Sequence, residues 1–118
     1  MQIGIDLGAT KIESVLLDQK GVEILRERND TPKAYKDTVI SIGKIVKNIE
    51  KKFNKKFSVG ICHPGSTISE TGLIKNSNNS IWMNNKPFQK DISTELNRIV
   101  YCENDANCFA LSEAIDGA

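Results

Sequence analysis

The first thirty residues alternate between hydrophobic and polar positions, which is the pattern of β-strands. Across residues 3–7 every second residue is aliphatic, and Gly4 and Asp6 stand between them. Residues 12–17 and 22–28 also have the make-up of strands, and short turns that contain glycine separate the three segments. Because consecutive strands joined by short turns pair side by side, we predict an antiparallel meander at the start of the chain.

The period of the pattern changes after Thr31-Pro32. Apolar residues then recur three or four positions apart through Phe53, which predicts an amphipathic helix. Beyond it we expect a strand at 57–62, a hairpin at 66–75, a helix at 91–97, a strand at 99–102 and a helix at 105–115. A meander followed by alternating strands and helices predicts an α/β fold, with a mixed five-stranded sheet and helices on both faces.

The composition excludes several classes of protein. Hydrophobic residues make up 39% of the 118 residues and charged residues 26%, so the chain is neither intrinsically disordered nor collagen-like. No apolar run approaches the roughly 20 residues of a membrane-spanning helix. The amino terminus also lacks the basic and apolar regions of a secretory signal. We therefore expect a cytoplasmic protein with no membrane partner.

Charge adds little about partners, because 16 basic and 15 acidic residues nearly cancel. The lysines on the outer side of the first helix have two interpretations, a nucleic-acid footprint or a solvated face; they are Lys44, Lys47, Lys51 and Lys55. The charge balance and the lack of interleaved aromatic residues favour the solvated face, so we expect no nucleic-acid partner. The cysteines and the single histidine lack zinc-finger spacing, so we expect no zinc in this chain.

The first candidate site includes most of the first strand and the turn after it, and comprises Gly4, Ile5, Asp6, Leu7, Gly8, Ala9, Thr10 and Lys11. Small residues let backbone N–H groups approach an anion, while Thr10 adds a hydroxyl and Lys11 a charge. Asp6 would repel phosphate unless a cation lay between them, so we expect it to face Mg²⁺. The alternative is a plain hairpin whose glycines serve the turn. The motif is neither a Walker A loop nor G-x-G-x-x-G, and alone it leaves both interpretations open.

The second candidate site is Asn104-Asp105, where a predicted strand ends and a helix begins. Ligands of α/β sheets gather at the carboxyl ends of strands. An aspartate there can accept a proton from a hydroxyl group, and an asparagine can both donate and accept hydrogen bonds. The alternative is helix capping, which contributes about 1 kcal/mol.

The third candidate site is the Pro64-Gly65-Ser66 turn after the next strand, which exposes backbone groups suited to a neutral polyol. A plain turn is the alternative, and His63 is expected to pack or hydrogen-bond rather than to catalyse. The asparagine-rich residues 76–79 and Trp82 fit either a sugar pocket or a polar loop anchored by one aromatic ring.

Together, four segments resemble the ROK sugar kinases in order and spacing, and most of all the bacterial fructokinase or manno(fructo)kinase branch. They are Ile-Asp-Leu-Gly-Ala-Thr-Lys (5–11), Gly-Ile-Cys-His-Pro-Gly-Ser (60–66), Thr-Gly-Leu-Ile-Lys-Asn-Ser-Asn (71–78) and Glu-Asn-Asp-Ala-Asn-Cys (103–108). The resemblance runs over nearly all 118 residues. It implies an actin-like, ribonuclease-H-like ATPase fold in two lobes, with residues 1–118 as the amino-terminal lobe. It also implies ATP-dependent phosphorylation of a hexose, with fructose expected, at the 6-hydroxyl.

The resemblance also implies a role for each site residue. Residues 4–11 would form the first phosphate loop for ATP and Mg²⁺, and Asp105 would be the catalytic base. The sugar would be held by Gly65, Ser66, Asn78, Asn104 and Asp105. Ala9 replaces the family's usual second glycine, which is tolerable where that residue avoids positive φ.

The rest of the kinase is expected beyond residue 118. The family's second phosphate loop, adenine site and structural zinc motif have no counterpart here, so we expect the isolated chain to be inactive. We also expect the full-length protein to be a homodimer. The alternative is a non-catalytic sugar sensor of the same family; no helix-turn-helix precedes Ile3, which disfavours the repressor branch.

Overall fold

A computed structural model of the chain describes residues 1–104. Its strands are β1 (Gln2–Leu7), β2 (Lys11–Leu17), β3 (Glu23–Asp30), β4 (Ser58–His63), β5 (Ser66–Thr67), β6 (Ile74–Lys75) and β7 (Tyr101–Asn104). Its helices are α1 (Tyr35–Phe53), the 3₁₀ turn η1 (Ile81–Met83) and α2 (Phe88–Leu96). The predicted meander, first helix and hairpin are therefore confirmed. The helix expected at 105–115 lies outside the described residues.

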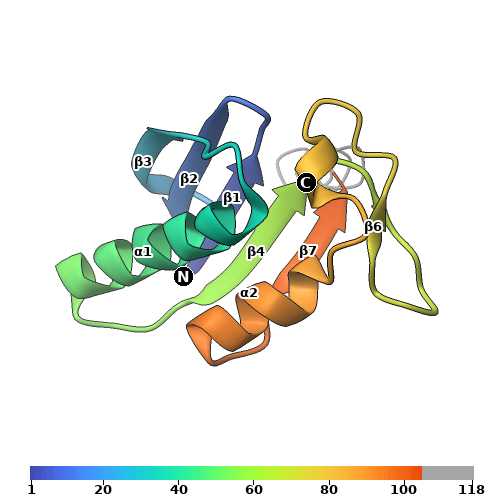
Figure 1. The fold of residues 1–118 in the computed structure, drawn as a ribbon. Coiled ribbons are helices and arrows are strands. Elements are labelled where there is room, and N and C mark those ends of the chain that lie inside the picture. Colours follow the sequence, from blue (N-terminus) through green and yellow to red (C-terminus); the bar gives the residue numbers. More distant parts are fainter. Residues whose placement is uncertain (105–118) are drawn as a thin grey trace.

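Five strands form one mixed sheet in the order β3-β2-β1-β4-β7. β1, β2 and β3 pair antiparallel, whereas β4 lies parallel to β1 and β7 parallel to β4. Because β1, β4 and β7 run the same way, they end side by side, as the arrowheads in Figure 1 show. We call the side of the sheet where these three strands end, at Leu7, His63 and Asn104, the carboxyl end, and the opposite side the amino end.

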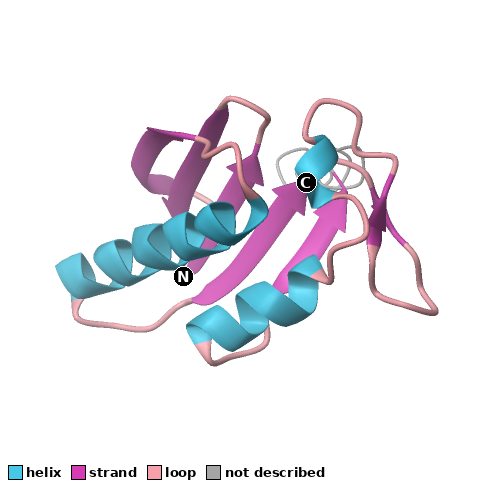
Figure 2. Ribbon diagram, in the orientation of Figure 1, coloured by secondary structure: helices cyan, strands magenta, loops and turns pink. Residues whose placement is uncertain are grey.

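Both α1 and α2 cover the same face of the sheet (Figures 1 and 2). Ile3, Ile5 and Leu7 of β1 point into this layer and are at most 2% exposed. Ile42 and Ile49 of α1 meet them from the helix side, fully buried. Burying each such side chain contributes about 1.5–3 kcal/mol, which is why the alternating and helical periods predicted this interface correctly.

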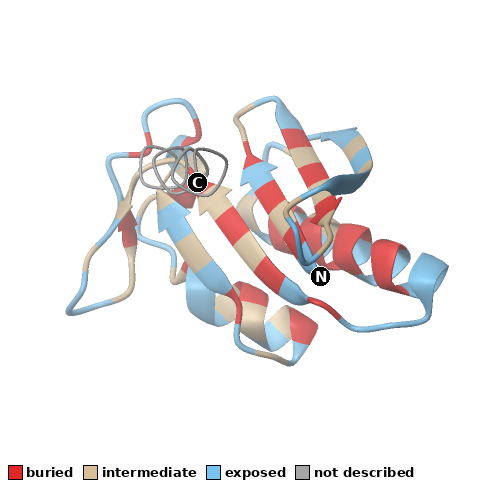
Figure 3. Cartoon of the chain, turned by 180° about the vertical axis from the view of Figure 1, so that it is seen from behind, coloured by how far each residue is buried: buried red, intermediate tan, exposed pale blue. Residues whose placement is uncertain are grey.

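Seen from behind, the other face of the sheet has no helix from residues 1–104 over it (Figure 3). The polar or small side chains of β1 point to this face: Gln2 and Asp6 are exposed and Gly4 is half-buried. The expectation of helices on both faces thus depends on residues outside the described part. Of the helices described, none is long and apolar enough to cross a membrane.

Several boundaries differ from the predicted ones by one to three residues, and two of the differences have a clear physical reason. α2 begins at Phe88 rather than at 91, because the Asp91 N–H donates to Pro87 O and the Phe88 ring is buried in the core. β7 runs to Asn104 because its ladder with β4 extends to the pair His63 and Asn104. Ile99 is 74% exposed and stands outside the ladder.

Candidate functional site

The three sequence motifs lie together at the carboxyl end of the sheet. The glycine-containing turn follows β1, the Pro64-Gly65 turn follows β4, and Asn104 ends β7. The strand register places Asp6 beside Cys62, and His63 beside Asn104. Asp105 lies outside the described residues. The structure therefore brings the two turns and Asn104 to the same end of the sheet.

The turn of residues 8–10 is tight, and two of its backbone donors have no acceptor within residues 1–104. The Gly8 N–H donates to Lys11 O over 2.9 Å, and a Cβ atom on Gly8 would lie 2.9 Å from that same oxygen, too close for any other residue without a backbone shift. Ala9 has no positive φ, which meets the condition for alanine at this position. Within residues 1–104, the N–H groups of Ala9 and Thr10 donate to no acceptor. Such a turn can receive an anion.

Thr31, just beyond β3, contacts this turn and was not identified from the sequence. Its Oγ1 donates to Gly8 O and its backbone N–H donates to Thr10 O, each over 2.9 Å. The residue is 7% exposed. The sequence indicates only that Thr31 follows β3, a strand that pairs with β2. No known motif links a threonine to a glycine 23 positions away.

Lys11, one of the predicted cofactor-binding residues, has a charged partner on a neighbouring strand. Its ammonium group forms an ion pair with Asp30 on the neighbouring strand β3, and both side chains are largely solvent-exposed. Hydrogen bonding from Lys11 lowers the pKa of Asp30. In this arrangement, the anion-binding capacity of the turn rests on its backbone N–H groups and Thr10.

Asp6 carries the other charge at this site. Partial burial raises its pKa, and the neighbouring carboxylate of Glu13 raises it further. Glu13 stands opposite Asp6 on β2 and accepts from Arg26 over 2.5 Å, a hydrogen bond that lowers the pKa of Glu13. Glu13 is thus held as an anion, a feature that sequence reasoning missed.

A carboxylate oxygen is a suitable donor for Mg²⁺, so Asp6 fits the chemistry expected of it. Among residues 1–104, however, no three histidine, cysteine, aspartate or glutamate side chains gather closely enough to hold a metal ion. Mg²⁺ at Asp6 would therefore take most of its ligands from phosphate and water, which is its usual habit at nucleotide sites.

Gly65 joins the turn after β4 to the hairpin of β5 and β6. Its φ is +76°, and a Cβ atom there would lie 2.5 Å from Lys75 O and 3.1 Å from Ser77 N. Ser66, which is half-buried, pairs with Lys75 in the hairpin. The structure thus brings two of the predicted motifs, residues 60–66 and 71–78, into direct contact.

The asparagine-rich loop is held by a side chain that the sequence did not single out, Asn84. Its Oδ1 accepts from the Ser77 N–H over 2.9 Å, and its Nδ2 donates to Ser77 O over 3.3 Å. Asn78, which was predicted to bind the sugar, is exposed and adjoins Ser77, the residue that Asn84 holds. Trp82 is half-buried against the core, in agreement with an anchoring aromatic.

His63 packs in the core as expected. It is 1% exposed, its Nδ1 lies 3.0 Å from Pro64 O, and its ring meets that of Phe88 edge-on at 5.6 Å between centroids. This geometry holds the turn after β4 against α2. Asn104, its half-buried neighbour on β7, is the polar group of the pair at the candidate site.

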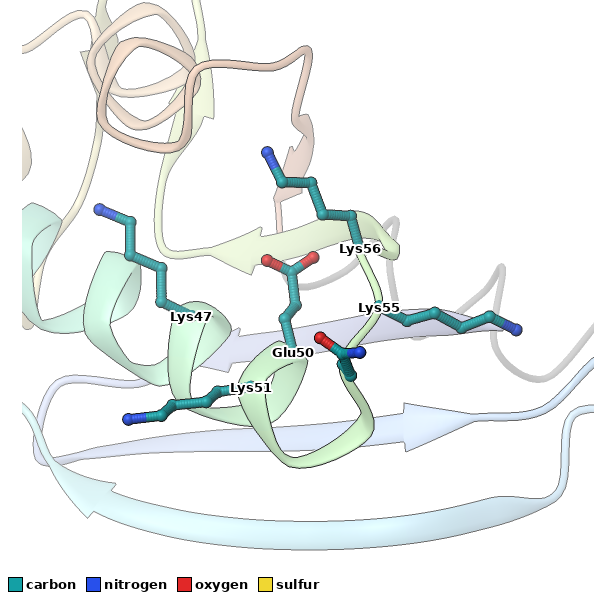
Figure 4. A pocket seen from close by; sticks show the side chains of 6 residues that line it. Lys47, Glu50, Lys51, Lys55 and Lys56 are labelled. Atoms are coloured by element: carbon teal, nitrogen blue, oxygen red, sulfur yellow. The ribbon is translucent and has the colours of Figure 1, made fainter.

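The lysines near the end of α1 lie away from this site. Figure 4 shows a shallow pocket around the end of α1, with lysine side chains pointing outward around Glu50; its lining includes Lys47, Lys51, Lys55 and Lys56. The end of α1 lies at the amino end of the sheet, because the chain passes from there directly into β4. The lysines that line this pocket therefore lie at the opposite end of the sheet from the candidate site.

Comparison with known proteins connects this geometry to a family. A match to the ROK family covers residues 2–118. The N-acetyl-D-glucosamine kinases of Histophilus somni and Haemophilus influenzae are 44% and 40% identical to the chain over 117 residues. Each match covers 98% of this chain and 38% of the relative. The chain thus spans about two fifths of the length of these relatives.

Solved structures of the family share the fold. A ROK glucokinase from Streptomyces griseus, in complex with glucose and AMPPNP, aligns with a TM-score of 0.85 at 26% identity, covering 99% of this chain and 37% of that one. A polyphosphate/ATP-glucomannokinase from Arthrobacter aligns with a TM-score of 0.84 at 26% identity, covering 99% and 49%. The expected actin-like α/β fold is confirmed, and the chain belongs to the ROK family.

Proposed function

We propose that this chain is the amino-terminal lobe of an ATP-dependent sugar kinase, which transfers the γ-phosphoryl group of ATP to the 6-hydroxyl of a hexose. The observation that carries the proposal is that three features meet at one end of the sheet: the Ala9 and Thr10 N–H groups, which have no acceptor in the described part of the chain, the Gly65 turn and Asn104. A phosphoryl donor and a polyol need to be held side by side for transfer.

Each group has a task in this proposal. The turn of residues 8–10 holds phosphate oxygens of ATP, with Mg²⁺ beside Asp6. Asn104 and the segment from Gly65 to Asn78 bind sugar hydroxyls. Asp105 accepts the proton of the 6-hydroxyl as its oxygen attacks the γ-phosphorus atom. A carboxylate in that role contributes about 10²–10⁴-fold in rate.

The choice of sugar has two candidates. Motif resemblance favours fructose, whereas the curated relatives named above are N-acetyl-D-glucosamine kinases. We place N-acetyl-D-glucosamine first, because identities of 40–44% span 98% of this chain. A panel of both sugars with glucose and mannose, assayed by ADP release from the full-length protein, ranks them by kcat/KM.

Replacing the proposed base tests the reaction itself. In the full-length protein, Asp105→Asn should lower kcat by about 10²–10⁴-fold with sugar binding largely kept. The matched control is Asp18→Asn in the β2–β3 turn, where the carboxylate only accepts from the N–H groups of Lys20 and Val22. Unchanged turnover in Asp105→Asn would contradict the role of Asp105 as the base. A wild-type protein that binds sugar without any turnover would favour the alternative, a non-catalytic sugar sensor. We expect residues 1–118 alone to show no turnover.

A further inference from the structure

We propose that Thr31 is a positioning residue that holds the turn of residues 8–10 in its phosphate-receiving conformation. The inference rests on the proposed function, because it takes this turn as the first phosphate loop. Thr31 is 7% exposed, and both its hydroxyl and its backbone N–H are engaged within the chain. It therefore acts on the nucleotide through the turn and not by touching it.

The two contacts of Thr31 grip the turn on both sides of Ala9. The hydroxyl donates to Gly8 O and the N–H donates to Thr10 O, each over 2.9 Å. The second bond continues the β2–β3 ladder by one residue beyond the pair Lys11 and Asp30. The first is a side-chain bond, so only the identity of residue 31 supplies it.

Holding these carbonyl groups also sets the direction of the N–H groups. In a planar trans peptide the C=O and N–H bonds point in opposite directions. With Gly8 O turned toward Thr31, the N–H of Ala9 faces away from it, and the same holds for Thr10 O and the N–H of Lys11. The Ala9 N–H, one of the two donors proposed to receive phosphate, is thus aimed by the bond from the Thr31 hydroxyl to Gly8 O, and the second bond fixes the peptide that follows Thr10.

The flexibility of Gly8 is the reason that the turn needs the hydrogen bond from Thr31. Glycine has the widest choice of backbone conformations, so the peptide after Gly8 can rotate at small energetic cost. The described residues offer one donor to Gly8 O, which is the Thr31 hydroxyl. The nearby Lys11–Asp30 ion pair is solvent-exposed and therefore a weak constraint by comparison.

Thr31→Val in the full-length protein tests the inference, because valine keeps the shape and the backbone N–H but removes the donor to Gly8 O. We expect the KM for ATP to rise about tenfold, the value of one lost hydrogen bond, and the KM for the sugar to change less than about twofold. Thr31→Ser keeps the hydroxyl and should restore the KM for ATP to within about twofold of the wild type.

The matched control is Thr38→Val. Thr38 is another buried threonine, and its Oγ1 also lies within hydrogen-bond distance of backbone carbonyls, those of Pro32 and Ala34. It does not contact the turn. We expect Thr38→Val to lower Tm by about as much as Thr31→Val while leaving the KM for ATP unchanged. If Thr31→Val lowers Tm but leaves the KM for ATP at the wild-type value, Thr31 is merely structural and the inference is wrong.

The outcomes separate this inference from the proposed function. Direct titration with ATP gives a Kd for each variant whether or not a sugar is phosphorylated. Wild-type protein that binds ATP without phosphorylating any sugar would overturn the proposed function, and the Kd of Thr31→Val would still decide the role of Thr31. Wild-type protein that does not bind ATP would overturn both.

Discussion

The two ends of the sheet are held together by different interactions. At the amino end, Arg98 donates two hydrogen bonds to Glu50, over 2.6 and 2.8 Å, and a third to Phe57 O over 2.9 Å. Glu50 also accepts from the Phe57 N–H over 2.8 Å and is only 7% exposed. Charged groups there satisfy one another and join α1, the residue before β4 and the segment after α2.

At the carboxyl end, neutral side chains hold backbone instead. Thr31 forms a hydrogen bond with the turn after β1, and the Asn84 side chain forms two with the backbone of Ser77. In the turn after β1, the N–H groups of Ala9 and Thr10 stay free of acceptors within residues 1–104. At the amino end the charged groups thus satisfy one another, whereas at the carboxyl end the donors of the turn are left for the ligand that we propose. Substitutions at the amino end should alter stability, and those at the carboxyl end should alter binding.

The largest loss of stability is expected from Arg98→Met at the amino end. The variant leaves the Glu50 carboxylate buried with a single remaining N–H donor, from Phe57. Removing one partner of a buried ion pair typically costs about 3–5 kcal/mol of unfolding free energy. Urea unfolding measures this loss, and ATP affinity per folded molecule should not change.

The double variant Glu50→Gln, Arg98→Met is the control for this prediction. It removes the unpaired charge while keeping an acceptor for the Phe57 N–H, so it should be more stable than Arg98→Met alone by about 1 kcal/mol or more. A loss below about 1 kcal/mol in Arg98→Met would show that the amino end is not held by this pair.

A smaller loss is expected from Gly65→Ala at the carboxyl end. Alanine at positive φ costs about 1–2 kcal/mol, and here its Cβ would also meet Lys75 O at 2.5 Å, for a total of about 2–4 kcal/mol. Gly72→Ala is the matched control, with a φ of +73° but no atom within 4 Å of the added Cβ. Thermal unfolding of both variants isolates the steric contribution, and equal losses would contradict it.

The pH dependence of stability should single out Glu50. Burial by itself raises its pKa, but hydrogen bonds from Arg98 and Phe57 outweigh burial and lower the pKa below its ordinary value of 4.5. A lowered folded-state pKa contributes stability that is complete above the ordinary value and is lost as pH falls through the folded one. The stability difference between wild type and Glu50→Gln should therefore be constant above about pH 5 and shrink toward pH 3. A difference that grows on acidification would contradict this sign.

Most of the fold could be predicted because its elements are locally encoded. Alternation in residues 3–7 and the helical period through Phe53 place the same side chains in the core that the structure buries. The start of α2 and the 3₁₀ turn η1 were missed, because Phe88 and Met83 are placed by burial against distant residues rather than by their neighbours in sequence.

The turns of the candidate site could be predicted from the sequence, but the side chains that hold these turns in place could not. The glycines at 8 and 65 signal turns, and parallel strands bring those turns together. Thr31 reaches Gly8 across 23 positions, and this contact exists only once β2 and β3 have paired. The Lys11–Asp30 pair depends on the same register, so it too could not be predicted from the sequence.

The smallest effect is expected from Asn84→Asp. This variant tests whether the sugar-binding segment and the phosphate-binding turn at the carboxyl end act independently. Aspartate keeps the acceptor for the Ser77 N–H but loses the donor to Ser77 O, a bond of 3.3 Å. We expect the KM for the sugar to rise about threefold to tenfold, because Asn78 adjoins the loosened residue, and the KM for ATP to stay unchanged. Steady-state kinetics of the full-length protein with both substrates measures this. Since Thr31→Val should do the reverse, a variant pair that shifts both KM values together would show that the two turns act as one unit.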